Sequence, residues 1–170
     1  MSIILQKATL ADAKLIWQIQ LKAFKELLDK YQDYNTNPGN DKIDKIIEQM
    51  NEENSIFYLI KDDEQVVGAI RAVEPKDKPY KKLGPVMVLP EYQGRGIAQQ
   101  AIALIEDIYG SDYWTLVTIL QEDKLCHLYE KMGYKKTDET LPLKDGMTLM
   151  AFMKNYQPGA ETFKFGFGGR

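Results

Sequence analysis

The chain has 170 residues, with 22 Lys plus Arg against 25 Asp plus Glu and a formal net charge of −3. This weakly acidic balance lacks the concentrated basic field of a nucleic-acid binder, so we expect no nucleic-acid partner. The single cysteine, Cys126, and the single histidine, His127, cannot form a disulfide within the chain or a zinc site of the Cys/His type. We therefore expect no metal.

The length suits one folded domain with one core. Hydrophobic residues make up 44% of the chain and charged residues 28%, close to the averages of soluble globular proteins. No apolar run approaches the roughly 20 residues that cross a bilayer, and the N-terminus lacks a basic region followed by a long apolar stretch. We expect a cytoplasmic protein with no membrane partner.

Helical and extended periodicities predict the elements in chain order. The first helix follows a capping signal in which Asp12 stands three positions after Thr9. Turn formers at residues 35–40 predict the loop before the second helix. The predicted strands are 3–7, 56–60, 66–73, 83–89, 114–120, 134–140 and 147–155. Of the predicted helices, the first ends near residue 31 and the other three cover 43–50, 96–109 and 123–132. No repeat or linker divides residues 1–155, which we predict to be one domain of the α/β (α+β) class.

Residues 156–170 form a C-terminal extension with a different pattern. Phe163, Phe165 and Phe167 alternate with other residues after a Pro-Gly break. Two interpretations remain open: a terminal tail without function, or a strand that adds to a neighbouring chain. The second interpretation leaves a homodimer open.

The most informative segment runs from Val86 to Ala98. An apolar strand stops at Pro90, a glycine-rich turn follows, and a helix begins at once. Unpaired N–H groups and the positive end of the helix dipole favour an anion at such a turn, and Arg95 adds a permanent cation. Glycines allow a close approach of the backbone, so the segment suits a pyrophosphate.

Known phosphate-binding patterns do not account for this turn. The Walker A pattern GxxxxGK[ST] is absent, and the turn does not follow the first strand of a dinucleotide-binding unit. A tight turn that merely connects two elements remains the alternative.

Two motifs resemble those of a known family. Gln93-x-x-Gly96-x-Ala98 resembles the (Arg/Gln)-x-x-Gly-x-(Gly/Ala) signature of the GCN5-related N-acetyltransferases, the GNAT superfamily. Residues 128–134, Leu-Tyr-Glu-Lys-Met-Gly-Tyr, resemble a second segment of that family. The order of predicted elements over residues 3–154 also agrees with the family. The resemblance implies a mixed, mostly antiparallel sheet of about seven strands, splayed between strands 4 and 5 and flanked by about four helices.

The resemblance also implies acetyl-CoA as co-substrate and assigns its contacts. The strand before Pro90 would hold the pantetheine arm, the turn would hold the pyrophosphate, and residues 114–120 would form the other wall of the cleft. The implied cofactor-binding residues are Val86, Met87, Val88, Gln93, Gly94, Arg95, Gly96, Ile97, Ala98 and Tyr129.

Catalysis in this family is direct attack of an amine on the acetyl group in a ternary complex. Tyr129 matches the tyrosine that protonates the departing thiolate, and a phenol has a suitable pKa for that step. Packing on the cofactor is the alternative for Tyr129. Glu122 stands where many members have an asparagine, and Val117 stands where some members have a glutamate base. Glu122 is therefore a candidate base or a site for a cationic acceptor, with a helix-cap role as the alternative. No cysteine nucleophile is needed, and we expect His127 on a helix surface.

The acceptor is expected to enter between the first helix and the splayed strands. Tyr31, Tyr34 and Arg71 are the candidate substrate-binding residues, with a structural ion pair as the alternative for Arg71. The sequence predicts an N-acetyltransferase for a primary amine of a small molecule or protein. A non-catalytic acyl-CoA-binding sensor or scaffold is the alternative function, and transfer of a longer acyl chain also stays open.

Overall fold

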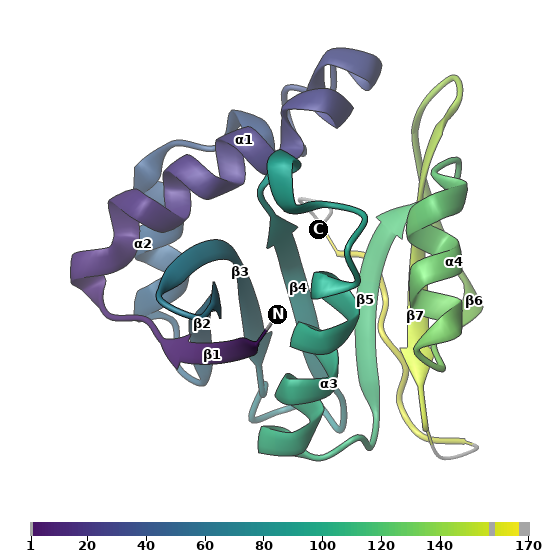
Figure 1. Cartoon of the computed structure of the whole chain (residues 1–170). Helices are drawn as coiled ribbons and strands as arrows, with labels where there is room; N and C mark the ends of the chain where they lie inside the picture. Colours follow the sequence, from purple (N-terminus) through teal and green to yellow (C-terminus); the bar gives the residue numbers. More distant parts are fainter. Residues whose placement is uncertain (1, 157–158, 167–170) are drawn as a thin grey trace.

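A computed structural model describes residues 2–156 and 159–166 of the chain (Figure 1). Within them lies a seven-stranded sheet with strand order β1-β2-β3-β4-β5-β7-β6. The strands are β1 (Ile3–Lys7), β2 (Ser55–Asp62), β3 (Gln65–Val73), β4 (Lys81–Val88), β5 (Trp114–Ile119), β6 (Lys135–Lys144) and β7 (Met147–Lys154). The α-helices are α1 (Ala13–Tyr31), α2 (Ile43–Asn51), α3 (Ile97–Tyr109) and α4 (Asp123–Lys131). The predicted element order is confirmed.

The largest boundary difference concerns β6, which runs to Lys144 where the sequence predicts an end at residue 140. Pro142 lies inside this strand and is aligned with Thr148 of β7. A proline is tolerated here because β6 is the last strand of the sheet, so one of its sides needs no backbone donor. A proline weakens a strand prediction, so the predicted strand ends before Pro142.

Strands β4 and β5 separate soon after they meet. They pair in parallel only at Lys81 with Trp114 and at Lys82 with Thr115. Beyond these positions β4 stays paired with β3, and β5 stays paired with β7 along its whole length. Figure 1 shows the two strands diverging from this point. The predicted splay between strands 4 and 5 is confirmed.

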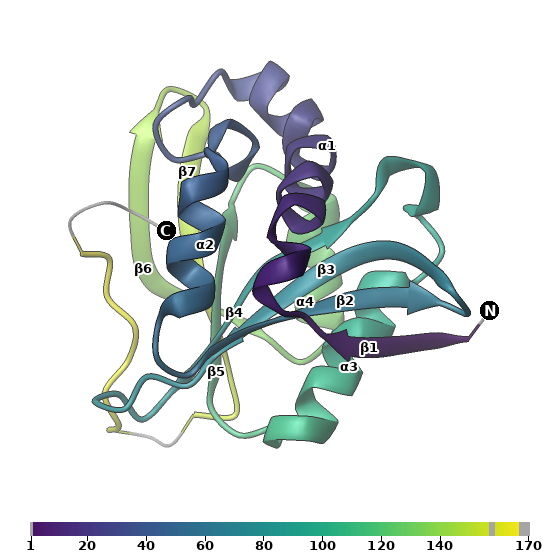
Figure 2. The same ribbon diagram turned by 90° about the vertical axis from the view of Figure 1, so that its left-hand side faces the viewer.

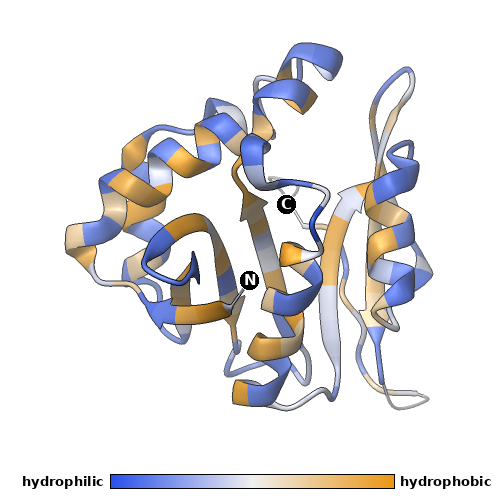
Figure 3. Ribbon diagram, viewed as in Figure 1, coloured by the Kyte–Doolittle hydropathy of each residue, from blue (hydrophilic) through white to orange (hydrophobic). Residues whose placement is uncertain are grey.

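Helices cover both faces of the sheet. α3 and α4 pack on one face, where Ile102, Trp114 and Phe152 belong to the largest buried cluster. α1 and α2 pack on the other face, where a second cluster includes Ile16 and Ile46. Figure 2 shows α1 and α2 together on their face, and Figure 3 shows hydrophobic residues recurring along α1 and α3 between hydrophilic ones. The sheet thus lies between two apolar layers, which is how amphipathic helices bury their apolar stripes.

Hydrogen bonds hold α1 and the loop after it in place. The Thr9 amide donates to the Asp12 carboxylate at 2.9 Å, which confirms the predicted capping signal. Trp17 Nε1 donates to the Asp41 carbonyl oxygen at 2.8 Å, and Gln20 Nε2 donates to the Pro38 carbonyl oxygen at 2.9 Å. In the described part of the chain, no helix is both long and apolar enough to pass through a membrane.

The described part of the C-terminal extension lies against its own chain. Phe163 packs with the buried residues Tyr80, Tyr113 and Met153. Phe165 packs with a separate buried cluster formed by Ile119, Met147 and Leu149. Phe167 lies outside the described residues. A strand shared with a neighbouring chain, and the homodimer it would form, stay predictions.

Candidate active site

The glycine-rich turn joins the end of β4 to the start of α3. A short 3₁₀ helix, Pro90–Tyr92, begins the turn, and Gly96 is the N-cap of α3. Gly94 and Gly96 have φ angles of 78° and 76°, in the left-handed region that other residues avoid. A Cβ added at either glycine would meet no heavy atom within 4 Å, so the space beside this backbone is open.

This open space is bordered by groups that favour an anion. The first amides of α3, among them those of Ile97 and Ala98, have no acceptor within the helix and carry its positive dipole end. Gly94, Arg95 and Gly96 are exposed, so a ligand can reach them. The turn residues predicted to hold a pyrophosphate therefore lie beside open, exposed space, and their binding of an anion stays a prediction.

Two side chains brace the turn. Gln93 Nε2 donates to the Val88 carbonyl oxygen at 3.0 Å and so ties the turn to the end of β4. Arg95 Nη2 donates to the Glu91 carbonyl oxygen at 3.2 Å, and its guanidinium lies 5.4 Å from the centre of the Tyr92 ring. Arg95 is thereby held beside the turn, where its charge adds to that of the helix end.

The end of β4 presents its backbone edge to the splay. Met87 is 1% exposed and packs under α1 and α2, while Val88 packs in the cluster under α3, so these side chains are occupied by the two cores. The register aligns Val86, Met87 and Val88 with β3 on one side. In the described residues, β5 supplies no partner for them on the other side. Apart from the Val88 carbonyl oxygen, which accepts from Gln93, the outward N–H and C=O groups of this edge can bind an extended chain that carries amides.

Helix α4 carries Tyr129 inward from the far side of the splay. Tyr129 is 8% exposed, and the centre of its ring lies 6.3 Å from the ring centres of both Tyr134 and Phe152. The side chain therefore packs in the cluster under α3 and α4. This placement is compatible with either role considered for Tyr129, and its part in catalysis stays a prediction.

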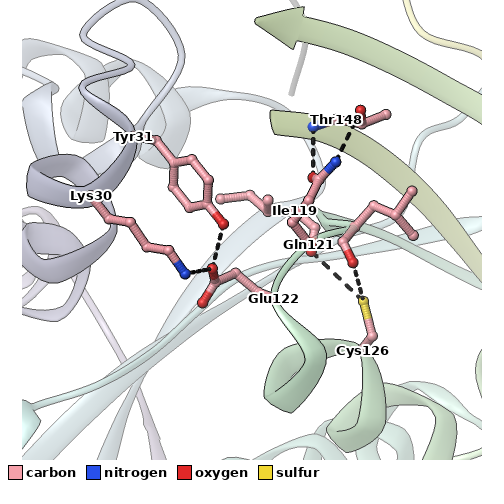
Figure 4. A network of polar contacts seen from close by, with 8 residues as sticks. Lys30, Tyr31, Ile119, Gln121, Glu122, Cys126 and Thr148 are labelled. Atoms are coloured by element: carbon pink, nitrogen blue, oxygen red, sulfur yellow. Dashed lines mark hydrogen bonds and ion pairs between the residues drawn. The ribbon is translucent and has the colours of Figure 1, made fainter. Parts of the chain in front are cut away.

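Glu122, the N-cap residue of α4, meets the C-terminal end of α1 (Figure 4). Its Oε2 accepts hydrogen bonds from Lys30 Nζ at 2.7 Å and from the Tyr31 hydroxyl. Lys144 Nζ in turn donates to the Tyr31 carbonyl oxygen at 2.7 Å. The end of α1 is thus fastened to elements on the far side of the splay.

Charge in this cluster is set by the hydrogen bonds. Burial acts to raise the pKa of Glu122, but the bonds from Lys30 and Tyr31 outweigh it and lower that pKa. Burial, followed by the bond to Glu122, raises the pKa of Tyr31. Glu122 is consequently a carboxylate and Tyr31 a neutral phenol at neutral pH. Such a carboxylate binds cations well but is a weak base.

The other two candidate substrate-binding residues, Tyr34 and Arg71, have contacts other than the cluster around Glu122. Tyr34 is 57% exposed. Arg71 Nη2 forms an ion pair with Glu52 Oε2 at 2.7 Å, and Arg71 Nε donates to Ser55 Oγ at 2.9 Å. Burial lowers the pKa of Arg71, against the opposing effect of Glu52. The ion pair is the structural alternative named above for Arg71, and acceptor binding by Tyr34 and Arg71 stays a prediction.

The sequence did not single out Lys30 or Lys144. Lys30 is in the last turn of α1, where a lysine usually faces solvent and favours the helix dipole. Lys144 is the exposed last residue of β6, so neither position gave a signal for a tertiary contact. Their partners, Glu122 and Tyr31, are 92 and 113 residues away respectively.

Cys126 and His127 take no part in the cluster around Glu122 and Tyr31. His127 is exposed on α4, as expected. Cys126 is buried, its Sγ lies 3.6 Å from the Leu120 carbonyl oxygen, and burial raises the pKa of the thiol. In residues 2–156 and 159–166, no three or more His, Cys, Asp or Glu side chains gather as a set able to hold a metal ion.

The sheet splays between β4 and β5, and a glycine turn precedes α3. This combination is the fold of the acetyltransferase class. The sequence model of the Acetyltransferase (GNAT) family matches residues 21–134, and the chain belongs to this family. The recognition made from the two motifs is confirmed. Comparison with curated protein sequences gives no match.

Solved structures of acetyltransferases share the fold at low sequence identity. The PaiA N-acetyltransferase of Thermoplasma acidophilum, in complex with coenzyme A, is 17% identical with a TM-score of 0.66, covering 92% of this chain and 100% of that one. A spermidine N-acetyltransferase chimera of Vibrio cholerae SpeG and hSSAT is 18% identical with a TM-score of 0.70, covering 91% and 96%. The ribosomal-protein-S18-alanine N-acetyltransferase of Escherichia coli is 13% identical with a TM-score of 0.71, covering 96% and 100%.

Proposed function

We propose that this protein transfers the acetyl group of acetyl-CoA to a primary amine of a small molecule or protein, by direct attack in a ternary complex. One observation carries the proposal. The unpaired backbone edge of β4 leads straight into the open glycine turn at the start of α3. An extended chain with amides and a pyrophosphate needs these two features in this order.

The residues present fit coenzyme A. Gly94 and Gly96 leave room for phosphate oxygens beside the first amides of α3, and Arg95 adds a cation. The edge of β4 at Val86–Val88 can exchange backbone hydrogen bonds with the amides of a pantetheine arm. The coenzyme A complex of the PaiA acetyltransferase, which shares the fold, supports this assignment.

The chain supplies groups for each part of the transfer. Bound acetyl-CoA would supply the activated thioester. The outward N–H groups of β4, which β5 does not pair, would orient and polarise a carbonyl oxygen at the splay. As the new C–N bond forms and the C–S bond breaks, the Tyr129 hydroxyl gives its proton to the thiolate sulfur. The acceptor nitrogen loses one proton to solvent before it attacks as a neutral amine. The second proton, lost as the amide forms, replaces through solvent the proton that Tyr129 gave to the thiolate.

Glu122 is assigned to the acceptor. Its carboxylate is ionised, its side chain is 18% exposed, and both of its bonds reach Oε2. The contacts of the described residues therefore leave Oε1 for an incoming ammonium group. A charge-assisted hydrogen bond there would hold the amine while Tyr31 and Lys30 keep the carboxylate in place. The assignment favours cationic acceptors, and the spermidine N-acetyltransferase chimera that shares the fold is consistent with it.

An amine screen tests this proposal. Free thiol released from acetyl-CoA is measured with a panel of small amines and with peptides that carry a free N-terminus or a lysine. We expect thiol release that depends on the amine and saturates with it. Binding of acetyl-CoA without turnover of any amine, including at high pH, would contradict the proposed transfer.

A non-catalytic acyl-CoA sensor is the second candidate function. It is favoured by one observation: the Glu122 carboxylate already has Lys30 and Tyr31 of the same chain as partners. In a sensor these contacts would simply cap α4 and join the two halves of the fold. Tight binding of acetyl-CoA with no turnover in the same screen would select this function.

A further inference from the structure

The C-terminal segment 159–166 returns over the domain on the side of β5 and β7 (Figure 2). Its Phe163 ring lies 6.3 Å from the centre of the Tyr80 ring and 5.1 Å from that of Phe165. Both phenylalanines are partly buried. The segment is therefore an ordered part of the surface rather than a free end.

Side-chain alternation along β5 shows which face the segment covers. Trp114 and Leu116 pack in the cluster under α3 and α4. Val117 and Ile119 belong to the opposite face, because successive odd positions point the same way. Phe165 packs against the cluster around Ile119, and so does Tyr31 of α1. The segment thus shares the α1 face of the splayed strands with the residue that holds Glu122.

Polar contacts fix the segment at several points. The Tyr113 hydroxyl donates to the Glu161 carbonyl oxygen, and Lys78 Nζ forms an ion pair with Glu161 Oε1 at 2.7 Å. The Phe165 amide donates to Glu139 Oε1 at 2.9 Å. Since Glu139 belongs to β6 and Tyr113 precedes β5, the segment is held at both ends across this half of the sheet.

This placement matters if the chain is an acetyltransferase. A donor bound along β4 and at the start of α3 approaches the splay from the side of α3 and α4. The acceptor must then come from the other face, which carries α1, Tyr31 and Phe165. On that face an ionised carboxylate, Glu122, stands beside an apolar cluster.

We propose that Phe165, held by segment 159–166, is a specificity-determining wall of the acceptor site. The inference rests on the proposed acetyl transfer. Glu122 would bind the ammonium group of the acceptor, and the apolar cluster would bind its narrow alkyl chain. The favoured acceptor is therefore a small primary amine with an unbranched alkyl chain, and amines on large or branched bodies are excluded by the Phe165 ring.

The test compares Phe165→Ala, Phe165→Trp and the control Phe163→Ala in the full chain. Phe163 packs on Tyr80 and Tyr113, in a cluster that does not contain Tyr31, and its ring also neighbours that of Phe165. Its loss therefore loosens the same segment without removing the Phe165 ring. The value of kcat/KM is measured for n-butylamine and for bulky benzhydrylamine at saturating acetyl-CoA. Affinity for acetyl-CoA and the thermal unfolding midpoint are measured alongside.

Removing the ring in Phe165→Ala should raise the bulky-to-slender ratio of kcat/KM by about tenfold, and Phe165→Trp should lower it. Phe163→Ala should leave the ratio unchanged, and all variants should keep their acetyl-CoA affinity. The inference is overturned if both Phe165 variants leave the ratio unchanged, or if Phe163→Ala changes it equally. If the wild type turns over neither these amines nor any other, the proposed transfer itself fails and the inference falls with it.

Discussion

The Tyr31 hydroxyl donates a hydrogen bond to the Glu122 carboxylate, joining the last residue of α1 to the N-cap of α4 across 91 residues of sequence. Lys30 reinforces the contact from the same turn of α1. The two halves of the splayed sheet, which share few β4–β5 pairs, are thereby linked through α1 and α4. This link makes Glu122 the first residue to test.

Glu122→Gln keeps the shape of the side chain but removes its charge. We expect KM for a cationic amine to rise about tenfold, since a charge-assisted hydrogen bond becomes a neutral one. Affinity for acetyl-CoA should stay the same. Steady-state kinetics with the amine varied, together with calorimetric titration of acetyl-CoA, checks both values. An unchanged KM for the amine would remove Glu122 from the acceptor site.

The lowered pKa of Glu122 also predicts a pH dependence of stability. The folded state binds this proton less readily than the unfolded state, whose reference pKa is 4.5. The stabilisation is therefore fully present above pH 4.5 and is lost as pH falls through the lower pKa of the folded state. Urea unfolding of wild type and Glu122→Gln at several pH values should show a gap in unfolding free energy that narrows below pH 4.5. A gap that stays constant into that range would contradict the ionised cluster.

Gly96→Val tests the phosphate position. Its side chain would enter the open space beside the first amides of α3, so we expect acetyl-CoA binding to be lost. Gly146, in the turn between β6 and β7, is a matched control because its φ of 77° and its open surroundings are alike. Both valine variants should lose about 1 to 3 kcal/mol of stability from backbone strain. Equal loss of acetyl-CoA binding in both variants would show strain rather than a phosphate site.

Tyr129→Phe should lower kcat by roughly 10²-fold and leave acetyl-CoA affinity nearly intact, if its hydroxyl protonates the thiolate. Tyr134→Phe is the control. The Tyr134 hydroxyl is buried without a hydrogen-bond partner among the described residues, and its ring neighbours that of Tyr129. Its removal should leave turnover unchanged. A wild-type rate in Tyr129→Phe would assign that residue to packing alone.

The ion pair between Glu106 and Lys154 fastens α3 to β7. The two side chains lie 2.5 Å apart and are 8% and 16% exposed, respectively. Glu106→Ala would leave a largely buried ammonium group without its partner, and we expect a loss of about 3 kcal/mol in unfolding free energy. Asp29→Ala breaks an exposed pair with Lys25 and should change stability little. Chemical denaturation of both variants measures the difference.

Local patterns in the sequence predicted the elements and the glycine turn, because strand, proline, glycines and helix follow one another within residues 86–98. The contacts of Glu122 with Lys30 and Tyr31 could not be predicted, since they join elements far apart in sequence. The alternating phenylalanines left open a tail without function or a strand for a neighbouring chain, and they gave no signal that Phe163 and Phe165 pack on their own domain. Periodicity identifies an apolar face but not what covers it. The cytoplasmic location and the lack of a nucleic-acid partner stay predictions from composition.

The most direct test of acetyl transfer counts both products in one reaction. Acetyl-CoA and an accepted amine are incubated with the wild-type protein, and coenzyme A thiol and acetylated amine are quantified together by mass spectrometry. We predict that they appear in equal amounts and that Gly96→Val forms neither. Thiol release without acetylated amine, or no release with any amine, would contradict the assignment of β4, the glycine turn and Tyr129 to acetyl transfer.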